Sequence, residues 1–434
     1  MTRRRLKENP VRREHPGLVI ALAAGLVASA VLVPTSLATG IRQGDGTDDT
    51  DPAVVTTWNA IAERTILTEN STPIPVSGQY FGFVSIAVYD AVVTIEGHYR
   101  PYLKQPRAQA HASTQAAAAT AAYRVLSHYF PASARQLEAD YSASLSDVSS
   151  GPAKARGQEV GQAAADALIA ARRNDGRDAA RSLDVTPGPG RWRPANSEPM
   201  RVQWLGFVRP LVLKSPKQVE LPGPDPLDSE AYARELAEVT KKGAKDGSSR
   251  TAEQTETALF WSANPVAQYQ QALRDKVTRR GLDTVTSARA FALLGTSTAD
   301  ALVACWRTKY DFAFWRPGTA IHLADIDGNG DTTGDPEWKP LIATPPDPEY
   351  VSSHACITGA ATETFRRLFG GRSLDLNVSS PVTSTTRHFD SALLLDDETR
   401  SSQVWQGLQF RQAVDDGNRL GRQVANWVAT HQFR

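Results

Sequence analysis

The chain has 434 residues, of which 41% are hydrophobic and 22% are charged, and this composition is typical of a folded protein with a sizeable core. The composition excludes a disordered chain and a polytopic membrane protein, and the length allows two to three domains. A formal charge of +1 indicates neither a nucleic-acid partner nor a stable membrane-surface partner. Two cysteines are too few for a disulfide scaffold or a cysteine-based metal cluster.

The first 38 residues have the pattern of a secretory signal peptide. Six basic residues lie within the first 13 positions, an apolar run follows from Leu18 to Val33, and small residues follow Pro34. This apolar run is short for a membrane span of about 20 residues, although an uncleaved anchor remains the alternative. Removing residues 1–38 leaves 42 basic against 45 acidic residues, or about −3. We therefore expect an exported, mildly acidic protein, with residues 39–52 as a solvated linker.

Beyond residue 52 the hydrophobic periodicity predicts successive helices. One covers 156–173 and another covers 229–243, where it ends in two lysines and a glycine. Further helical patterns begin near Ser249, Asn264 and Thr284, and again after Ser353. Sustained alternation with period two is absent. The sequence thus predicts an all-α fold built of helical bundles.

Residues 187–226 interrupt this helical pattern, because they contain nine of the 27 prolines. Proline at this density prevents regular helix, while the tryptophans and phenylalanine in the same stretch argue against a free linker. We interpret the stretch as an ordered connector between an N-terminal helical half, 53–186, and a C-terminal helical half, 227–434.

The residues with chemical potential lie in the C-terminal half. Lys309 and Arg316 are seven residues apart, about two helical turns, so both cations can point the same way, and Pro317 is expected to end their helix. Ser352, Ser353 and His354 open the helical pattern 356–369. Free backbone N–H groups and the helix dipole favour an anion at such a helix start. These side chains together would suit a tetrahedral oxyanion such as phosphate or vanadate.

The order of these residues resembles the vanadium-dependent haloperoxidase family, which shares its site with the type-2 phosphatidic acid phosphatases. The resemblance is carried by Lys309 to Pro317, by Pro348 to His354, and by flanking stretches that place 53–430 inside the family. It implies an all-α fold of helical bundles and one oxyanion pocket, with vanadate as cofactor and peroxide and halide as substrates. It also implies that Lys309 and Arg316 bind the oxyanion and that His354, Ser352 and Ser353 are catalytic.

The third motif of the family departs from the pattern. The alignment places Gln403 at an oxyanion-binding arginine and Gln409 at the histidine that coordinates vanadium, and no histidine occurs between His388 and His431. A glutamine amide is neither a nucleophile nor a suitable axial vanadium ligand. Val351 and Ser353 also replace the proline and glycine of the second motif. The resemblance therefore implies a weakened vanadate site.

Three functions follow from these residues. The first is a haloperoxidase with weak or lost activity. The second is a non-redox enzyme that performs acid–base chemistry on an organic substrate at Lys309, Arg316 and His354. The third is a catalytically inactive protein that binds phosphate-like anions. None of them specifies an oligomeric state.

Other patterns carry less weight. Asp325, Asp327, Asn329 and Asp331 resemble the start of a calcium loop, but proline stands where its bidentate glutamate belongs, so a polar turn is favoured over calcium. We expect no other metal ligands. Cys305 and Cys356 are equally compatible with a disulfide and with two buried thiols. His322 is close enough to Pro317 in sequence to line the pocket or to lie on the surface.

Overall fold

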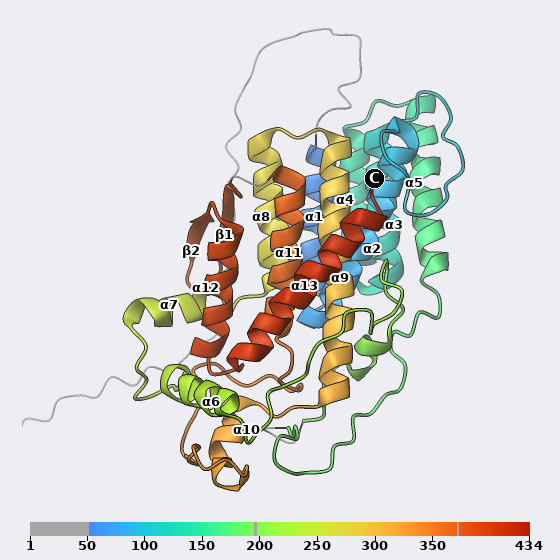
Figure 1. The fold of residues 1–434 in the computed structure, drawn as a ribbon. Helices are drawn as coiled ribbons and strands as arrows, with labels where there is room; N and C mark the ends of the chain where they lie inside the picture. Colours follow the sequence, from blue (N-terminus) through green and yellow to red (C-terminus); the bar gives the residue numbers. More distant parts are fainter. Residues whose placement is uncertain (1–51, 195–197, 371–372) are drawn as a thin grey trace, which may run out of the picture. The chain divides into compact units, whose positions relative to one another are not determined.

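The computed structural model describes residues 52–194, 198–370 and 373–434. The predicted signal peptide and almost all of the predicted linker lie outside these residues. The helices are α1 (Ala53–Glu63), followed by a π-helical turn (Arg64–Glu69), α2 (Ile74–Glu96), α3 (Thr114–Tyr129), α4 (Ala134–Ser146), α5 (Pro152–Ala171), α6 (Glu230–Gly243), α7 (Ala252–Phe260), α8 (Pro265–Arg280), α9 (Thr284–Phe312), α10 (Pro317–His322), α11 (Ser353–Phe369), α12 (Ala392–Trp405) and α13 (Arg411–His431) (Figure 1). Short 3-10 turns cover Pro131–Ser133, Gln203–Phe207 and Ala324–Ile326.

The all-α prediction is confirmed, with one small exception. Strands β1 (Leu376–Ser380) and β2 (Thr385–Phe389) form an antiparallel hairpin in which Leu376 pairs with Phe389. The buried residues of β1 do alternate with half-buried ones, but only over five positions. An alternation this short is not the sustained pattern that predicts a strand, so the sequence did not predict the hairpin.

Several helix starts lie where the sequence predicted them, because their caps are present. The Ser229 side chain accepts a hydrogen bond from the backbone N–H of Tyr232 at the start of α6. Asn264 caps α8, and Asp283 caps α9 in the same way. A side-chain oxygen at this position satisfies a backbone donor that the helix itself leaves free. The helix expected near Ser249 begins slightly later, at a capping box formed by Thr251 and Gln254.

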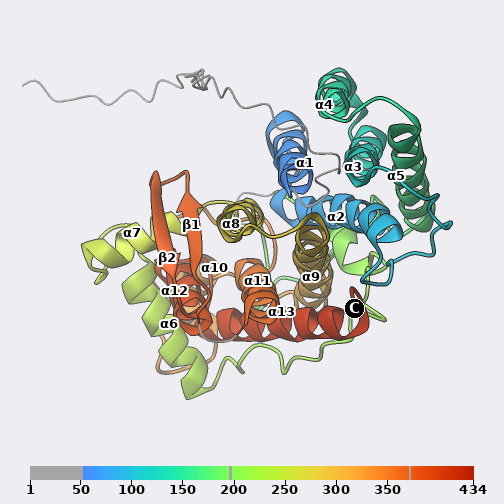
Figure 2. The same ribbon diagram turned by 90° about the horizontal axis from the view of Figure 1, so that it is seen from above.

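The core consists of long helices packed in pairs. Helix α2 packs against α9 and α11 packs against α13, and α13 runs across both α11 and α9 (Figures 1 and 2). Of the described helices, α2 is long and apolar enough to cross a membrane, but 83% of its most apolar window is buried inside the protein. Such burial is the ordinary state of a core helix that contacts other helices on every side.

The proline-rich segment is held by a carboxylate on α9. The backbone N–H groups of Leu211, Val212 and Leu213 donate to Asp300, at 2.6, 2.7 and 2.8 Å. Burial of Asp300 raises its pKa to about 6, although these three donors act against that rise. The segment is thus fixed to the middle of the core. The proposed boundaries at residues 186 and 226 stay predictions.

Helices α11 and α13 cross at glycines, which allow their backbones to touch. A Cβ atom added at Gly359 would lie 2.2 Å from the carbonyl oxygen of Asn418, and one at Gly421 would lie 2.1 Å from that of Cys356. No real Cβ approaches a backbone oxygen so closely, so any side chain here would separate the helices. This crossing fixes α11, whose first turn contains His354, against α13, which begins two residues after Gln409.

We predict that Gly421→Ala destabilises the protein by about 2 kcal/mol or more, even though alanine favours an isolated helix by about 1 kcal/mol over glycine. The reason is the forced separation of α11 and α13. Denaturant unfolding measures the change, and Gly330→Ala serves as the control because its Cβ would meet open space. A Gly421→Ala protein as stable as the parent would contradict the close crossing.

Candidate functional site

Lys309 and Arg316 come from different local structures, contrary to the expectation of one helix through both. Helix α9 ends at Phe312, because Ala313 adopts left-handed backbone angles. The following residues are held by backbone hydrogen bonds to the proline-rich segment, from Trp192 N–H to Ala313 and from Trp315 N–H to Gly190. Arg316 then precedes α10, so Pro317 begins a short helix instead of ending a long one. The prediction of a common helix was wrong.

The two cations nevertheless meet, at the side chain of Asp347. The Lys309 Nζ lies 2.9 Å from Asp347 Oδ1, and an Arg316 guanidinium nitrogen lies 2.6 Å from the same oxygen. Lys309 is 0% exposed and Arg316 is 3% exposed, so these contacts are shielded from water. Burial alone would raise the pKa of Asp347, but the two cations lower it below its usual value. Asp347 is therefore an anion.

Hydrogen-bond partners fill the remaining capacity of Lys309. An ammonium group has three donors. Besides Asp347, Nζ donates to the backbone carbonyls of Pro348 at 2.5 Å and of Glu349 at 3.1 Å. Arg316 also donates to the carbonyls of Asp347 and Leu408. Lys309 thus has no donor left for an external ligand.

His354 stands in the first turn of α11, as predicted. Ser352 is the cap of this helix, because its side chain accepts a hydrogen bond from the N–H of Ala355 at 3.3 Å. The His354 imidazole lies at the edge of the Trp261 ring, with 6.2 Å between the centroids, and its Nε2 has no hydrogen-bond partner. Burial lowers the pKa of His354 to about 3. The imidazole is therefore neutral near pH 7.

A cavity of about 340 Å³ opens beside His354. Its polar wall is formed by His354, Ser353, Asp347 and Gln403, with further polar atoms from Ser262 and Gln406. Its other walls are mainly apolar and aromatic, and they include Ile74, Trp261, Leu302, Trp306, Ile342 and Leu408. Mostly apolar walls with a few placed polar groups are the usual form of a small-molecule site.

The two glutamines of the third motif occupy different places. Gln403 lies on α12, is 4% exposed, and lines the cavity with its Nε2 unpaired. Gln409 is buried just before α13, but it is not among the residues that line the cavity. Its Nε2 donates to the carbonyl of Leu408, which also accepts from Arg316. Gln409 is thus close to the cations without facing the ligand space.

Sequence reasoning missed two acidic residues, Asp347 and Glu349. Glu349 is 1% exposed, and its carboxylate accepts a hydrogen bond from the N–H of Phe410 at 2.8 Å, at the start of α13. Burial raises the pKa of Glu349 to about 7. Their position in the sequence was the available signal, since both acids lie in the loop between Arg316 and His354.

The weaker candidates are placed away from the cavity. His322 is exposed, and its Nε2 lies 2.7 Å from the carbonyl of Trp338. Asp327 accepts hydrogen bonds from the backbone of Asn329 and from Thr332, the pattern of a polar turn. Among the described residues, no group of three or more His, Cys, Asp or Glu could hold a metal ion. Cys305 and Cys356 are buried free thiols.

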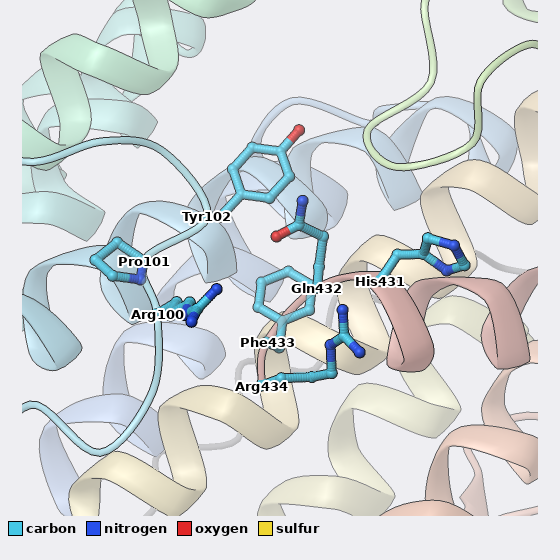
Figure 3. Close-up of a pocket in the computed structure, with 7 residues that line it drawn as sticks. All are labelled: Arg100, Pro101, Tyr102, His431, Gln432, Phe433 and Arg434. Carbon is cyan, nitrogen blue, oxygen red and sulfur yellow. The ribbon is translucent and has the colours of Figure 1, made fainter.

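A larger cavity, of about 650 Å³, lies at the other end of α13 (Figure 3). It is lined by residues 100–102 and by residues 431–434. Its two arginines, Arg100 and Arg434, are exposed to solvent. None of the residues that the sequence singled out for chemistry lies there.

Known proteins are similar to this chain in the sequence of the site region and in the fold. Residues 289–434, which contain Lys309, Arg316 and His354, match the family model described as the VCPO second helical-bundle domain. The vanadium chloroperoxidase of Curvularia inaequalis is 26% identical over 39% of this chain and 37% of its own length. The C-terminal region of the chain is thus similar in sequence to the vanadium haloperoxidases. The match thus spans well under half of that curated relative.

Two solved structures have the same fold as this chain. A bacterial vanadium-dependent iodoperoxidase aligns with a TM-score of 0.75 and 21% identity, over 90% of this chain and 98% of that one. A bacterial vanadium-dependent chloroperoxidase in its holo form aligns with a TM-score of 0.69 and 17% identity, over 88% and 97% of the two chains.

The residues present do not fit the vanadate of the family. A tetrahedral oxyanion needs free donors, yet all three donors of Lys309 are used and Arg316 shares the carboxylate of Asp347. An added oxyanion would meet the negative charge of Asp347 at the same point. Gln409 offers an amide, not an imidazole, and the Nε2 of this amide donates a hydrogen bond to the carbonyl of Leu408. We therefore assign no step of the chemistry to vanadate.

We predict that His354 makes the protein less stable in mild acid. Its pKa is about 3 when folded and about 6.5 when unfolded, so the unfolded state binds more protons between these values and stability falls as pH drops through them. His354→Asn should remove about 1–2 kcal/mol of the loss between pH 7 and pH 5.

The measurement is urea unfolding of both proteins at the two pH values. The buried carboxyls with raised pKa values act in the opposite direction, but they are common to both proteins. His98→Asn is the matched control, because His98 is exposed. Equal acid sensitivity of the parent and His354→Asn would show that His354 is not held neutral.

Proposed function

We propose that the chain is an exported protein of the vanadium haloperoxidase family in which vanadate-dependent halide oxidation is weak or lost. In its place, the pocket beside His354 binds a small organic molecule. The observation that carries the proposal is the contact of Lys309 and Arg316 with one oxygen of Asp347, at 2.9 and 2.6 Å. The proposal of export rests on the signal-peptide pattern of residues 1–38 alone.

The lining of the pocket supports an organic ligand. Its aliphatic side chains have no hydrogen-bond donors for a hydrated halide or for peroxide. The apolar walls would bury the apolar surface of a carbon skeleton away from water, which favours binding. The unpaired Nε2 of Gln403 can donate to an oxygen acceptor on that skeleton. A carbonyl compound would satisfy both conditions. The reading as an anion-binding protein is opposed by the filled donors of Lys309.

The protonation states of His354 and Asp347 leave the pocket with proton acceptors. Near pH 7 both His354 and Asp347 are without a proton, so the pocket presents two acceptors. Asp347 is a poor base because the two cations stabilise its charge. His354 is the remaining acceptor, and its pKa of about 3 makes it a weak base. Proton abstraction by His354 therefore depends on stabilising the charge that develops on the substrate, which Gln403 can do by hydrogen bonding. The proposed reaction is removal of a proton next to a carbonyl group.

The haloperoxidase part of the proposal is tested by metal content and turnover. We expect the purified protein to retain less than about a tenth of an equivalent of vanadium after incubation with orthovanadate and dialysis, because Lys309 has no free donor. Bromide oxidation by peroxide should stay at the background rate. The Curvularia inaequalis vanadium chloroperoxidase, treated in parallel, is the positive control. Stoichiometric vanadium with bromide turnover would refute the proposal.

The acid–base part is tested with a simple ketone. We expect the parent to speed the exchange of the α-protons of cyclohexanone in D₂O, measured by NMR, and His354→Ala to reduce the enzymatic rate about 100-fold, the ordinary contribution of a positioned base. His322→Ala is the matched control, since His322 does not line the cavity. Equal exchange with the parent and with His354→Ala would exclude His354 as the base.

A further inference from the structure

We propose that Asp347 is a built-in counter-anion that occupies the oxyanion position of this pocket and thereby selects its ligands. It closes the site to phosphate-like anions and leaves it to neutral molecules. The inference rests on the proposed function in that both take the cavity beside His354 as the ligand site.

The first support is the convergence of the donors. Lys309 and Arg316 approach the same atom, Asp347 Oδ1, from the end of α9 and from the start of α10. Two buried cations aimed at a single oxygen are the arrangement that a bound oxyanion requires. Here a side chain of the protein supplies that oxygen.

The second support is that the chain holds Asp347 in place. Its backbone carbonyl accepts a hydrogen bond from Arg316 Nε at 2.8 Å, and its N–H donates to Pro345 at 2.9 Å. On either side, Pro346 accepts from the N–H of Arg201, and the N–H of Glu349 donates to Phe314. The carboxylate is therefore positioned by the backbone on both sides and does not depend on the cations alone.

The third support is the location of Asp347 at the cavity wall. Removing its carboxylate would free one N–H of Lys309 and one of Arg316, both directed at the emptied space beside about 340 Å³ of cavity. The same change would leave two buried cations without their shared anion. An external oxyanion could then supply both the missing charge and the missing acceptor.

Inorganic phosphate is the probe for this inference. We expect calorimetry to detect no binding of phosphate to the parent at about 10 mM phosphate. This concentration is roughly ten times the largest dissociation constant that the experiment seeks to detect. Asp347→Ala should bind at least about tenfold more tightly, as one gained charge-assisted hydrogen bond allows. The melting temperature of Asp347→Ala should be about 3 °C or more higher in phosphate than in chloride at equal ionic strength. The melting temperature of the parent should be the same in both salts.

Two variants make the test specific. Asp311→Ala is the matched control, because Asp311 also bridges an arginine and a lysine, Arg307 and Lys217, but on the surface. It should gain no phosphate affinity. Lys309→Met combined with Asp347→Ala should lose the gain, because one of the two converging donors is removed. Asp347→Asn keeps the shape of the side chain and should gain less than Asp347→Ala.

A folded Asp347→Ala protein with no more phosphate affinity than Asp311→Ala would overturn the inference. So would an Asp347→Ala protein that fails to fold in chloride and in phosphate alike, since the anion should replace the lost charge. These outcomes are distinct from failure of the proposed function. An inactive parent in the ketone assay would count against that function and leave the phosphate result intact.

Discussion

Two buried cations side by side repel each other and have both lost their hydration, so a protein that keeps them must place an anion between them. In this chain the anion is the carboxylate of Asp347, and three segments depend on it. The end of α9 supplies Lys309, the start of α10 supplies Arg316, and the loop before α11 supplies Asp347 itself. The same loop leads directly into His354. The position of His354, which lines the pocket, therefore depends on the ion pairs that Asp347 forms a few residues earlier in the chain.

Local patterns predicted much of the fold, because helices carry their signals in neighbouring residues. Ser229, Asn264 and Asp283 cap helices through contacts that span two or three positions. The end of α9 could not be predicted in this way. Ala313 carries no turn signal, and its left-handed conformation is stabilised by a strand-like contact with residues 190–192, more than one hundred positions away in the sequence.

In the candidate site, too, neighbouring residues predicted some features, while others depend on contacts between residues distant in the sequence. The order of Lys309, Arg316 and His354 was enough to identify the pocket region, since it follows a family pattern. The sequence did not reveal that the cations are already neutralised, because an aspartate in a loop has many possible partners. Only the packing of α9, α10 and the loop onto one another decides that Asp347 meets both. Likewise, the backbone placement of Gln409 directs its amide to Leu408, which no spacing rule predicts.

The close crossing of α11 and α13 has an evolutionary consequence. Because glycines bring the two backbones into direct contact, the relative position of these helices is set by main-chain atoms and not by the side chains at their ends. His354 lies in the first turn of α11, and Gln409 lies just before α13. Either residue can therefore be substituted without displacing the helix that positions it. As long as the glycines are kept, substitutions in this pocket can replace one catalytic activity by another while the fold stays the same.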